Sequence, residues 1–474
     1  MGLVGRQSER AELLACLESN RSEFVALYGR RRVGKTFLVR QTLGHRFTFY
    51  ATGVLDGEGG MAAQLENFND EIAAQGGAHL TRATNWRQAF TNLHEMVKRA
   101  PAGKKVIFLD ELPWMATRGS GFLAALDYFW NRWASARNDV VLIVCGSATS
   151  WIIQHVVDNQ GGLHNRLTRQ ILLTQFTLRE CEEFFRQAGF VMTRYQMTEA
   201  YMVFGGVPYY LELMDPRFEL YHNIDRLCFA KDARLANEHH NLFRSLFGGA
   251  DGHLRIVEEL AAKAKGLTRE ELIAATHLPD GGHLSTVLTE LEQCGFIRSY
   301  TAFGKRERGK LYQLTDPYTL FALRFQTARH SYTDNYWRQY SATPGHAAWS
   351  GYAFEQVCLH HIPQIKAKLG ISGVLTSISS WRSSTHDPGA QVDLVIDRAD
   401  HVVNLCEIKY CVGEYTIDKP MNRSLRNKAA AFTAETKTRK AVRTTLITTF
   451  GLVRNEYAAE ILAEVTLDDL FAAT

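Results

Sequence analysis

A glycine-rich loop near the N-terminus limits most strongly what this chain can fold into. Residues 29–36 match the pattern G-x-x-x-x-G-K-[ST] at every fixed position, between an apolar run at 24–28 and an apolar helical pattern. Such a loop binds nucleotide phosphates through its backbone N–H groups and the positive end of the following helix dipole. We expect Lys35 to reach the terminal phosphates and the Thr36 hydroxyl to coordinate Mg²⁺. The predicted nucleotide-binding residues are Gly29, Arg30, Arg31, Arg32, Val33, Gly34, Lys35 and Thr36.

The composition indicates an ordered, globular protein with room for about three domains in its 474 residues. Lys and Arg (54) exceed Asp and Glu (50) by only four, so net charge alone does not indicate a nucleic-acid binder. The eight cysteines form no C-x-x-C pair, which fits a reducing cytosol. The apolar runs are far shorter than the roughly 18 residues of a membrane span, and no signal sequence is evident. We therefore expect a cytoplasmic protein with no membrane partner.

The chain divides by pattern into five segments. Short apolar runs alternate with helical patterns up to about residue 177, which predicts a parallel sheet with crossover helices and strands at 24–28, 46–51, 105–109, 140–145 and 169–174. A helical segment follows, interrupted by Gly205-Gly206-Val207-Pro208. Three short helices and two strands around a basic turn then predict a winged helix-turn-helix, and a second α/β unit ends the chain. The predicted boundaries are 1–178, 179–248, 249–316, a linker at 317–346, and 347–474.

A second motif supports a nucleotide-hydrolysing site. The buried strand-like run 105–111 ends in two carboxylates, and strand ends are where α/β sheets place ligands. We expect Asp110 to hold Mg²⁺-bound water and Glu111 to orient and deprotonate the attacking water. Ser147, after the next strand, is predicted to sense the γ-phosphate. Arg166, with Arg169, is a candidate to stabilise transition-state charge within the core or from a neighbouring subunit, the alternative being an ordinary surface arginine.

Residues 1–320 resemble the archaeal-type AAA ATPase family, close to the STAND and origin-recognition clades of P-loop NTPases. The resemblance implies ATP and Mg²⁺ as cofactors, a helical lid over 179–248, and Pro208 beside the base in the lid motif. It is also compatible with a nucleotide-dependent homo-oligomer. The residues that carry it are Val4-Gly5-Arg6 with Glu9, Gly29 to Thr36, Asp110-Glu111, Gly146-Ser147 and Gly205 to Pro208.

Acidic residues near the C-terminus form a second constellation. Asp393 lies in the strand-like run 391–397, and Glu407 and Lys409 lie in the run 402–409. Folded back on each other, the two runs place Asp393 opposite Glu407 to within one residue. Opposed like charges on neighbouring strands repel, and a divalent cation would remove the conflict. Lys409 shares a sheet face with Glu407 and can lower the pKa of a metal-bound water.

This Asp…Glu-x-Lys arrangement resembles the PD-(D/E)xK restriction-endonuclease-like nucleases. The resemblance implies a C-terminal α/β restriction-endonuclease-like domain with metal ligands Glu355, Asp393 and Glu407, and with Lys409 in a catalytic role. Gln391 departs from the commoner family pattern, which has a proline or an acidic residue near the aspartate. The alternative is a surface hairpin with ordinary charges.

Two basic clusters make nucleic acid, most of all DNA, the expected partner. The alternatives are a solvated face and, for the winged helix, packing on its own core. We read His239-His240 and His360-His361 as structural. The combined hypothesis is an ATPase whose nucleotide state gates a Mg²⁺-dependent nuclease-like domain; the rivals are a non-enzymatic switch and a DNA-remodelling or transposition-associated ATPase. The clusters comprise Lys305, Arg306, Arg308 and Lys310, and Arg423, Arg426, Lys428, Lys437, Arg439, Lys440 and Arg443.

Overall fold

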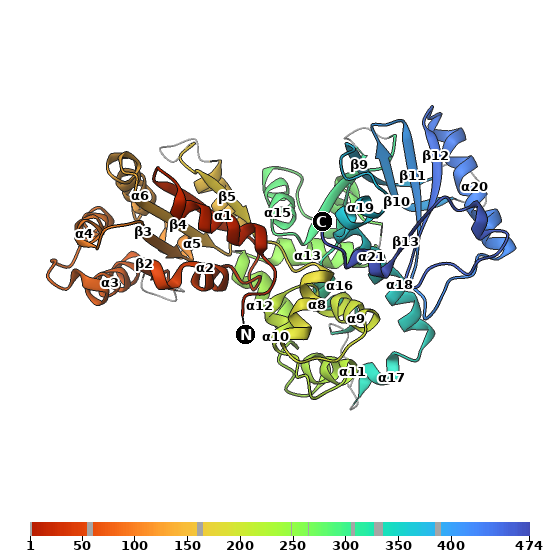
Figure 1. Cartoon of the computed structure of the whole chain (residues 1–474), viewed down its shortest axis with the longest axis horizontal. Helices are drawn as coiled ribbons and strands as arrows, with labels where there is room; N and C mark the ends of the chain where they lie inside the picture. Colours follow the sequence, from red (N-terminus) through yellow and green to blue (C-terminus); the bar gives the residue numbers. More distant parts are fainter. Residues whose placement is uncertain are drawn as a thin grey trace. The chain divides into compact units, whose positions relative to one another are not determined.

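The computed structural model divides into two compact units, Met1–Thr174 and Gln175–Thr474, which we describe separately (Figure 1). Unit 1 is built on the ATPase motifs, and unit 2 contains the remaining helices and two further sheets. The structure describes residues 2–54, 60–158, 165–247, 249–263, 265–304, 309–326, 335–383 and 390–474.

Unit 1 contains a five-stranded parallel sheet with the strand order β2-β3-β4-β1-β5. This confirms the parallel sheet and all five strands predicted from the sequence, although β5 ends at Leu172 instead of residue 174. Every residue of β3 and β4 is buried, because helices cover both faces of a parallel sheet. The strands are β1 (Glu23–Tyr28), β2 (Phe47–Thr52), β3 (Lys105–Asp110), β4 (Val140–Gly146) and β5 (Arg169–Leu172).

Two hydrophobic cores lie on opposite faces of this sheet. Neighbouring residues of a strand point to opposite faces, so Phe24 belongs to the core under α3, α4 and α6, while Val25 belongs to the core under α1 and α2. The phosphate loop follows the end of β1 and lies directly before α2. The helices are α1 (Gln7–Glu18), α2 (Lys35–Leu43), α3 (Gly60–Ile72), α4 (Trp86–Arg99), α5 (Leu112–Met115), α6 (Phe122–Arg132) and α7 (Thr149–Ile152).

Unit 2 begins with helices, as the sequence predicted. Capping boxes at Thr177 and Thr193 start α8 and α9. The predicted break after α9 is present: Gly205 has φ 63°, and a Cβ on Gly206 would lie 2.0 Å from the carbonyl oxygen of Phe176. Pro208 then opens α10, and its place beside a nucleotide stays a prediction. The helices are α8 (Leu178–Gln187), α9 (Arg194–Phe204), α10 (Pro208–Glu212), α11 (Leu220–Ile224) and α12 (Glu238–Leu246).

Three helices and a small antiparallel sheet of order β6-β8-β7 follow. The end of β7 contacts the C-terminal part of the same unit: the backbone N–H of Phe303 donates to the carbonyl oxygen of Ser380 at 3.0 Å, and the Phe303 ring centroid lies 4.8 Å from that of Phe432. Lys305, Arg306 and Arg308 lie outside the described residues. The elements are α13 (Asp251–Ala261), α14 (Arg269–Thr276), α15 (Gly282–Gln293), β6 (Leu267–Thr268), β7 (Ile297–Thr301) and β8 (Lys310–Leu314).

The segment 317–346, which we expected to be a linker, contributes to the core of unit 2. It forms α16 (Pro317–Phe325), whose residues are mostly buried, and α17 (Tyr336–Tyr340), in which Trp337 is 1% exposed. Its aromatic side chains pack closely; Phe325 and Trp337, for example, meet edge to face with ring centroids 5.1 Å apart. The described residues of this segment form packed helices because an aromatic-rich segment buries its apolar surface. Its role as the boundary between two domains stays a prediction.

The C-terminal part of unit 2 is a five-stranded mixed sheet with the order β13-β12-β11-β10-β9. Neighbouring strands from β9 to β11 are antiparallel, whereas β11, β12 and β13 are parallel. The second predicted α/β part is therefore present. Its elements are α18 (Pro344–His360), α19 (Ile362–Lys368), β9 (Thr376–Arg382), β10 (Gln391–Arg398), β11 (Val402–Lys409), α20 (Lys419–Thr436), β12 (Ala441–Thr448), β13 (Ala463–Thr466) and α21 (Leu467–Leu470).

Buried polar groups in unit 2 are partly satisfied by hydrogen bonds. His361 is fully buried; its Nε2 accepts from the backbone N–H of Leu178 at 2.9 Å, and its Nδ1 lies 2.7 Å from the carbonyl oxygen of Val357. Burial lowers the pKa of His361 to about 4, so the ring is neutral near pH 7. This agrees with the structural role expected for the second histidine pair.

A buried acid on α9 makes the stability of unit 2 depend on pH. Burial raises the pKa of Glu199 from its ordinary 4.5 to about 7, although the Tyr221 hydroxyl donates to it at 2.9 Å. The folded state favours the protonated form of Glu199. The stability of unit 2 with respect to this group is therefore highest below about pH 4.5 and falls as the pH rises through about 7. Relative to Glu199→Gln, we expect the wild type to lose about 3 kcal/mol of unfolding free energy over that window. Urea unfolding of both proteins at pH 5 and pH 8 measures the difference; identical pH dependence would contradict it.

Candidate nucleotide site and C-terminal acidic site

The phosphate loop has the backbone conformation that its glycines predict. Gly29 has φ 144°, and a Cβ there would lie 2.1 Å from the carbonyl oxygen of Leu173, so no larger residue fits. Gly34, with φ 91°, precedes the first residue of α2. Lys35 is 6% exposed, and its Nζ donates to the carbonyl oxygens of Gly29 and Arg30, both at 2.8 Å. The lysine ammonium therefore lies within the curve of the loop.

The two nucleotide motifs meet in unit 1. The Thr36 hydroxyl donates to Oδ2 of Asp110 at 2.7 Å, although β4 lies between the strands that carry the two motifs. Oδ1 of Asp110 accepts from the backbone N–H of Glu111 at 3.0 Å. A hydroxyl and a carboxylate oxygen side by side are the hard oxygen ligands that Mg²⁺ prefers, so these residues fit the ion that the sequence predicted here.

Glu111 is held by the serine that was predicted to sense the γ-phosphate. Oε2 of Glu111 accepts from the Ser147 hydroxyl at 2.9 Å and from its backbone N–H at 3.2 Å. The contact arises because both residues follow the carboxyl ends of adjacent parallel strands, β3 and β4. Glu111 itself has φ 48°, a conformation that a non-glycine residue adopts only rarely. The hydrogen bonds from Ser147 therefore orient Glu111, the residue predicted to act as the base.

Two residues beside the loop complete the site. Arg6, from the opening box, is buried and donates to the carbonyl oxygens of Thr174 at 2.6 Å and Val33 at 3.5 Å. Gly53, which the sequence analysis missed, donates its N–H to the carbonyl oxygen of Asp110 at 2.9 Å. A Cβ on Gly53 would lie 2.6 Å from the carbonyl oxygen of Glu111. The sequence signal that could have identified Gly53 is a glycine directly after a predicted strand, at the carboxyl end where the nucleotide motifs lie.

The structure does not bring Arg166 to the phosphate loop of the same unit. Thr168 donates its N–H to the carbonyl oxygen of Phe24, and Arg169 is the first residue of β5, so both arginines lie at or before the amino end of β5. The loop follows the opposite end of β1. A role for Arg166 within its own core is therefore wrong for this conformation, because parallel strands place their two ends on opposite sheet edges. A role at the site of a neighbouring copy stays a prediction.

The C-terminal hairpin has the register that the sequence predicted. Leu394 pairs with Cys406 across β10 and β11, and the next position of this register sets Asp393 opposite Glu407. Glu355 lies on α18, facing the same acids. Burial and repulsion from Asp393 and Glu407 raise the pKa of Glu355 to about 8, although Lys409 and Lys265 act in the opposite direction. The three predicted acids are therefore close enough to influence one another.

Two lysines bind the central acid of this cluster. Lys409 Nζ lies 2.8 Å from Oε1 of Glu407, and Lys428 Nζ, from α20, lies 2.6 Å from Oε2. Burial would raise the pKa of Glu407, but Lys428 and Lys409 outweigh it and lower the pKa. The sequence analysis had placed Lys428 only in the basic cluster, because nothing local shows that α20 crosses the end of β11.

The acids do not form a ligand group for a metal ion in this conformation. Within the described ranges, no three or more His, Cys, Asp or Glu side chains are spaced to hold one. The residue types suit a divalent cation, but their spacing does not, and both oxygens of Glu407 are bound by ammonium groups. The metal-ligand roles of Glu355, Asp393 and Glu407 therefore stay a prediction.

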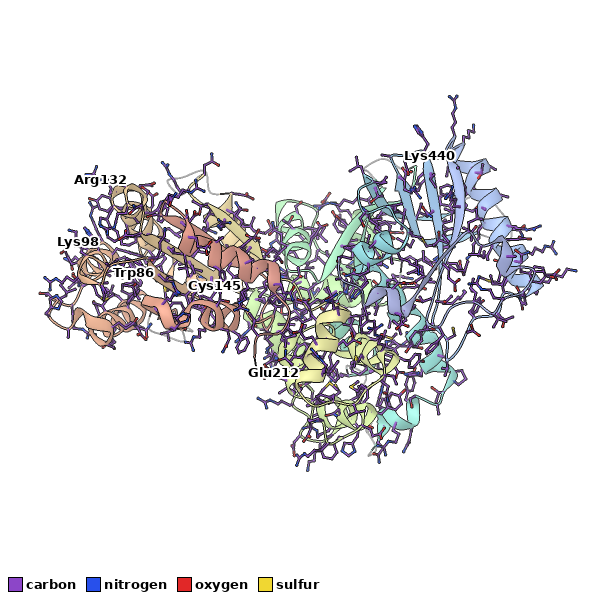
Figure 2. All side chains as sticks on the ribbon, viewed as in Figure 1. Trp86, Lys98, Arg132, Cys145, Glu212 and Lys440 are labelled. Carbon is purple, nitrogen blue, oxygen red and sulfur yellow. The ribbon has the colours of Figure 1, made fainter. Side chains whose placement is uncertain are left out.

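Part of the C-terminal basic cluster is paired within the unit. Arg426 pairs with Glu460, and Lys440, labelled in Figure 2, pairs with Asp397. The remaining unpaired members are exposed and are the ones available to a polyanion: Arg423, Lys437, Arg439 and Arg443.

A search of the described residues for membrane-spanning helices found none of sufficient length and hydropathy.

Comparisons with known proteins agree with the site in unit 1. Residues 3–214 match a family model described as an ATPase domain predominantly from Archaea. The uncharacterized protein MJECL04 of Methanocaldococcus jannaschii is 25% identical over 258 residues, which are 54% of this chain and 54% of that protein. The chain therefore spans about half the length of this curated relative.

Solved structures resemble this chain to different degrees, and the first of them shares its fold. The Walker-type ATPase PABY2304 of Pyrococcus abyssi has a TM-score of 0.51 at 19% identity, covering 68% of this chain and 96% of that chain. The ORC2 protein of Aeropyrum pernix, in ADPNP-ADP complexes, has a TM-score of 0.41 at 14% identity, covering 72% and 96%. Residues 3–214 are therefore similar to an archaeal-type ATPase domain, and the chain shares the fold of the Pyrococcus abyssi ATPase.

Proposed function

We propose that this protein binds ATP with Mg²⁺ at the phosphate loop of unit 1 and hydrolyses it to ADP and inorganic phosphate. The observation that carries the proposal is the 2.7 Å hydrogen bond from Thr36 to Asp110, which joins the two nucleotide motifs. The adjacent Glu111 supplies a carboxylate at the same sheet edge. Release of inorganic phosphate from ATP by the purified protein tests it directly.

Each residue of this site has a defined task. The N–H groups of the loop and the Lys35 ammonium bind the phosphate oxygens. A carboxylate oxygen of Glu111 accepts a proton from the attacking water, and the hydrogen bonds that Ser147 donates to Oε2 orient this carboxylate. Bound Mg²⁺ supplies positive charge that neutralises the phosphate oxygens. Arg166 is assigned to the site of a neighbouring copy in a nucleotide-dependent homo-oligomer.

The parts of unit 2 are proposed to link ATP hydrolysis to nucleic acid in the cytoplasm. Residues 179–248 would be the helical lid with Pro208 beside the base, and 249–316 a winged helix-turn-helix, supported by its three helices and hairpin. Residues 347–474 would be the restriction-endonuclease-like domain, supported by the mixed sheet and the Asp393–Glu407 register. The exposed basic residues after β11 suit DNA phosphates. The rival reading is a switch in which unit 2 only binds DNA or a protein partner.

The second candidate function is metal-dependent cleavage of nucleic acid in the C-terminal domain. The specific observation in its favour is that residues from α18, β10 and β11 meet in one acidic cluster, with Lys409 bound to Glu407 at 2.8 Å. A hairpin with ordinary surface charges would leave these acids solvated and apart. Nucleotide state would gate this activity.

Asp393→Ala and Lys409→Ala should each reduce Mg²⁺- or Mn²⁺-dependent cleavage of DNA by at least about 100-fold, because each removes a charge that the reaction requires. ATP hydrolysis should stay near the wild-type rate, since its motifs lie in unit 1. The measurement is cleavage of single- and double-stranded DNA and RNA with and without ATP. Lys368→Ala, a lysine of α19 in the same unit that pairs with Asp469 and belongs to neither basic cluster, is the control. Absence of cleavage by the wild type on every substrate and in every nucleotide state would favour the switch.

A further inference from the structure

A second lysine occupies the C-terminal acidic site. Lys428 lies on α20, a helix that buries Leu425 and Phe432 toward the sheet and carries exposed basic residues on its other side. Its Nζ is 2.6 Å from Oε2 of Glu407, which is 7% exposed. Lys428 is therefore at the boundary between the buried acids and the basic surface of the helix.

The two lysines together use both oxygens of Glu407. Lys409 binds Oε1 at 2.8 Å from the same strand, and Lys428 binds Oε2 from a different element. Each oxygen still has a second lone pair, but an ammonium repels a cation that approaches the same carboxylate. The two ammonium groups therefore compete with a metal ion for the carboxylate of Glu407. Among the described residues, no three or more His, Cys, Asp or Glu side chains are spaced to hold such an ion.

We propose that Lys428 is an internal counter-cation that holds Glu407 and opposes binding of a divalent cation until a phosphate of bound nucleic acid takes its ammonium. This inference rests on the metal site proposed above for the C-terminal domain. Lys428 is a positioning residue, because it acts through Glu407. Its long, flexible side chain can turn from the carboxylate to a phosphate, whereas Lys409 stays with Glu407 when Lys428 leaves.

The surrounding charges supply a matched control. The charge of Lys265 interacts with those of Asp393, Glu355 and Arg382, and no ion pair joins Lys265 to Glu407 within the described part of the chain. Lys440 forms a lysine–carboxylate ion pair with Asp397, which lies on β10 like Asp393, and this pair does not include Glu407. Replacing Lys440 therefore removes one positive charge and one ion pair from the same sheet and leaves Glu407 bound.

The experiment is calorimetric titration of the full-length protein with Mn²⁺, using the wild type, Lys428→Met, Lys428→Arg, Lys440→Met and Asp393→Ala. Asp393→Ala defines the binding that belongs to the acidic site. We expect Lys428→Met to bind Mn²⁺ about tenfold more tightly than the wild type, as expected for loss of a competing cation. Lys428→Arg keeps the charge and should match the wild type, as should Lys440→Met.

Equal Asp393-dependent affinity in the wild type and Lys428→Met would overturn the inference and leave the metal site standing. No Asp393-dependent binding in any variant would instead refute the metal site and the inference with it. If Lys428→Met fails to fold by circular dichroism, the wild type is titrated with Mn²⁺ with and without a phosphorothioate duplex that resists cleavage. A tighter Asp393-dependent affinity with the duplex supports release of Lys428 by phosphate, and an unchanged affinity overturns it.

Discussion

Lys35→Ala is expected to lower ATP hydrolysis by at least about 100-fold, the scale of losing one charge-stabilising group at a reacting centre. Nucleotide binding should weaken as well, because Lys35 is the fixed ammonium inside the loop and contacts the carbonyl oxygens of Gly29 and Arg30. Phosphate release and titration with a fluorescent ATP analogue measure the two effects.

Lys98→Ala is the control for this variant. Lys98 is an exposed lysine of α4 in the same unit, paired with Glu95 at 3.2 Å and labelled in Figure 2. Its loss should leave hydrolysis and binding unchanged. Wild-type turnover in a folded Lys35→Ala protein would refute the assignment of residues 29–36 as the nucleotide site.

Glu111→Gln is expected to keep nucleotide binding near the wild-type level and to reduce turnover by about 100- to 10,000-fold, the usual contribution of a general base. The amide oxygen can still accept the hydrogen bonds from Ser147 at 2.9 and 3.2 Å, so the local structure should persist. The amide cannot take a proton from water at neutral pH. Retained binding with lost turnover separates a catalytic role from a structural one.

Ser147→Ala is the companion variant. It removes the hydroxyl that holds Glu111 and keeps the backbone N–H contact and the carboxylate itself. We expect at most about a 100-fold change in turnover, because one hydrogen bond to a charged carboxylate contributes roughly 1.5–3 kcal/mol. If Glu111→Gln hydrolysed ATP as fast as the wild type, another group would have to activate the water.

Local patterns in the sequence were sufficient for the elements and the motifs. The apolar runs that became β3 and β4 are continuous because both faces of those strands are buried. The loop at 29–36 was recognisable because only glycine tolerates the backbone at Gly29 and Gly34. The register of Asp393 and Glu407 followed from the short connection between β10 and β11, which fixes the pairing of neighbouring strands.

The contacts between distant residues of the nucleotide site depend on strand order and packing, which local sequence patterns do not contain. The tertiary structure brought Thr36 to Asp110 across β4 and set Ser147 on Glu111. It placed Arg166 at the far edge of the same sheet.

The same limit applies in unit 2. Packing turned the expected linker at 317–346 into a buried aromatic cluster, because its apolar surface found partners elsewhere in the chain. It also brought Lys428 to Glu407, 21 positions earlier in the sequence. The sequence by itself determined the local elements, the phosphate loop and the acidic hairpin. Only the tertiary structure decided which distant side chains meet, because those contacts depend on the order of strands and on how helices cover their ends.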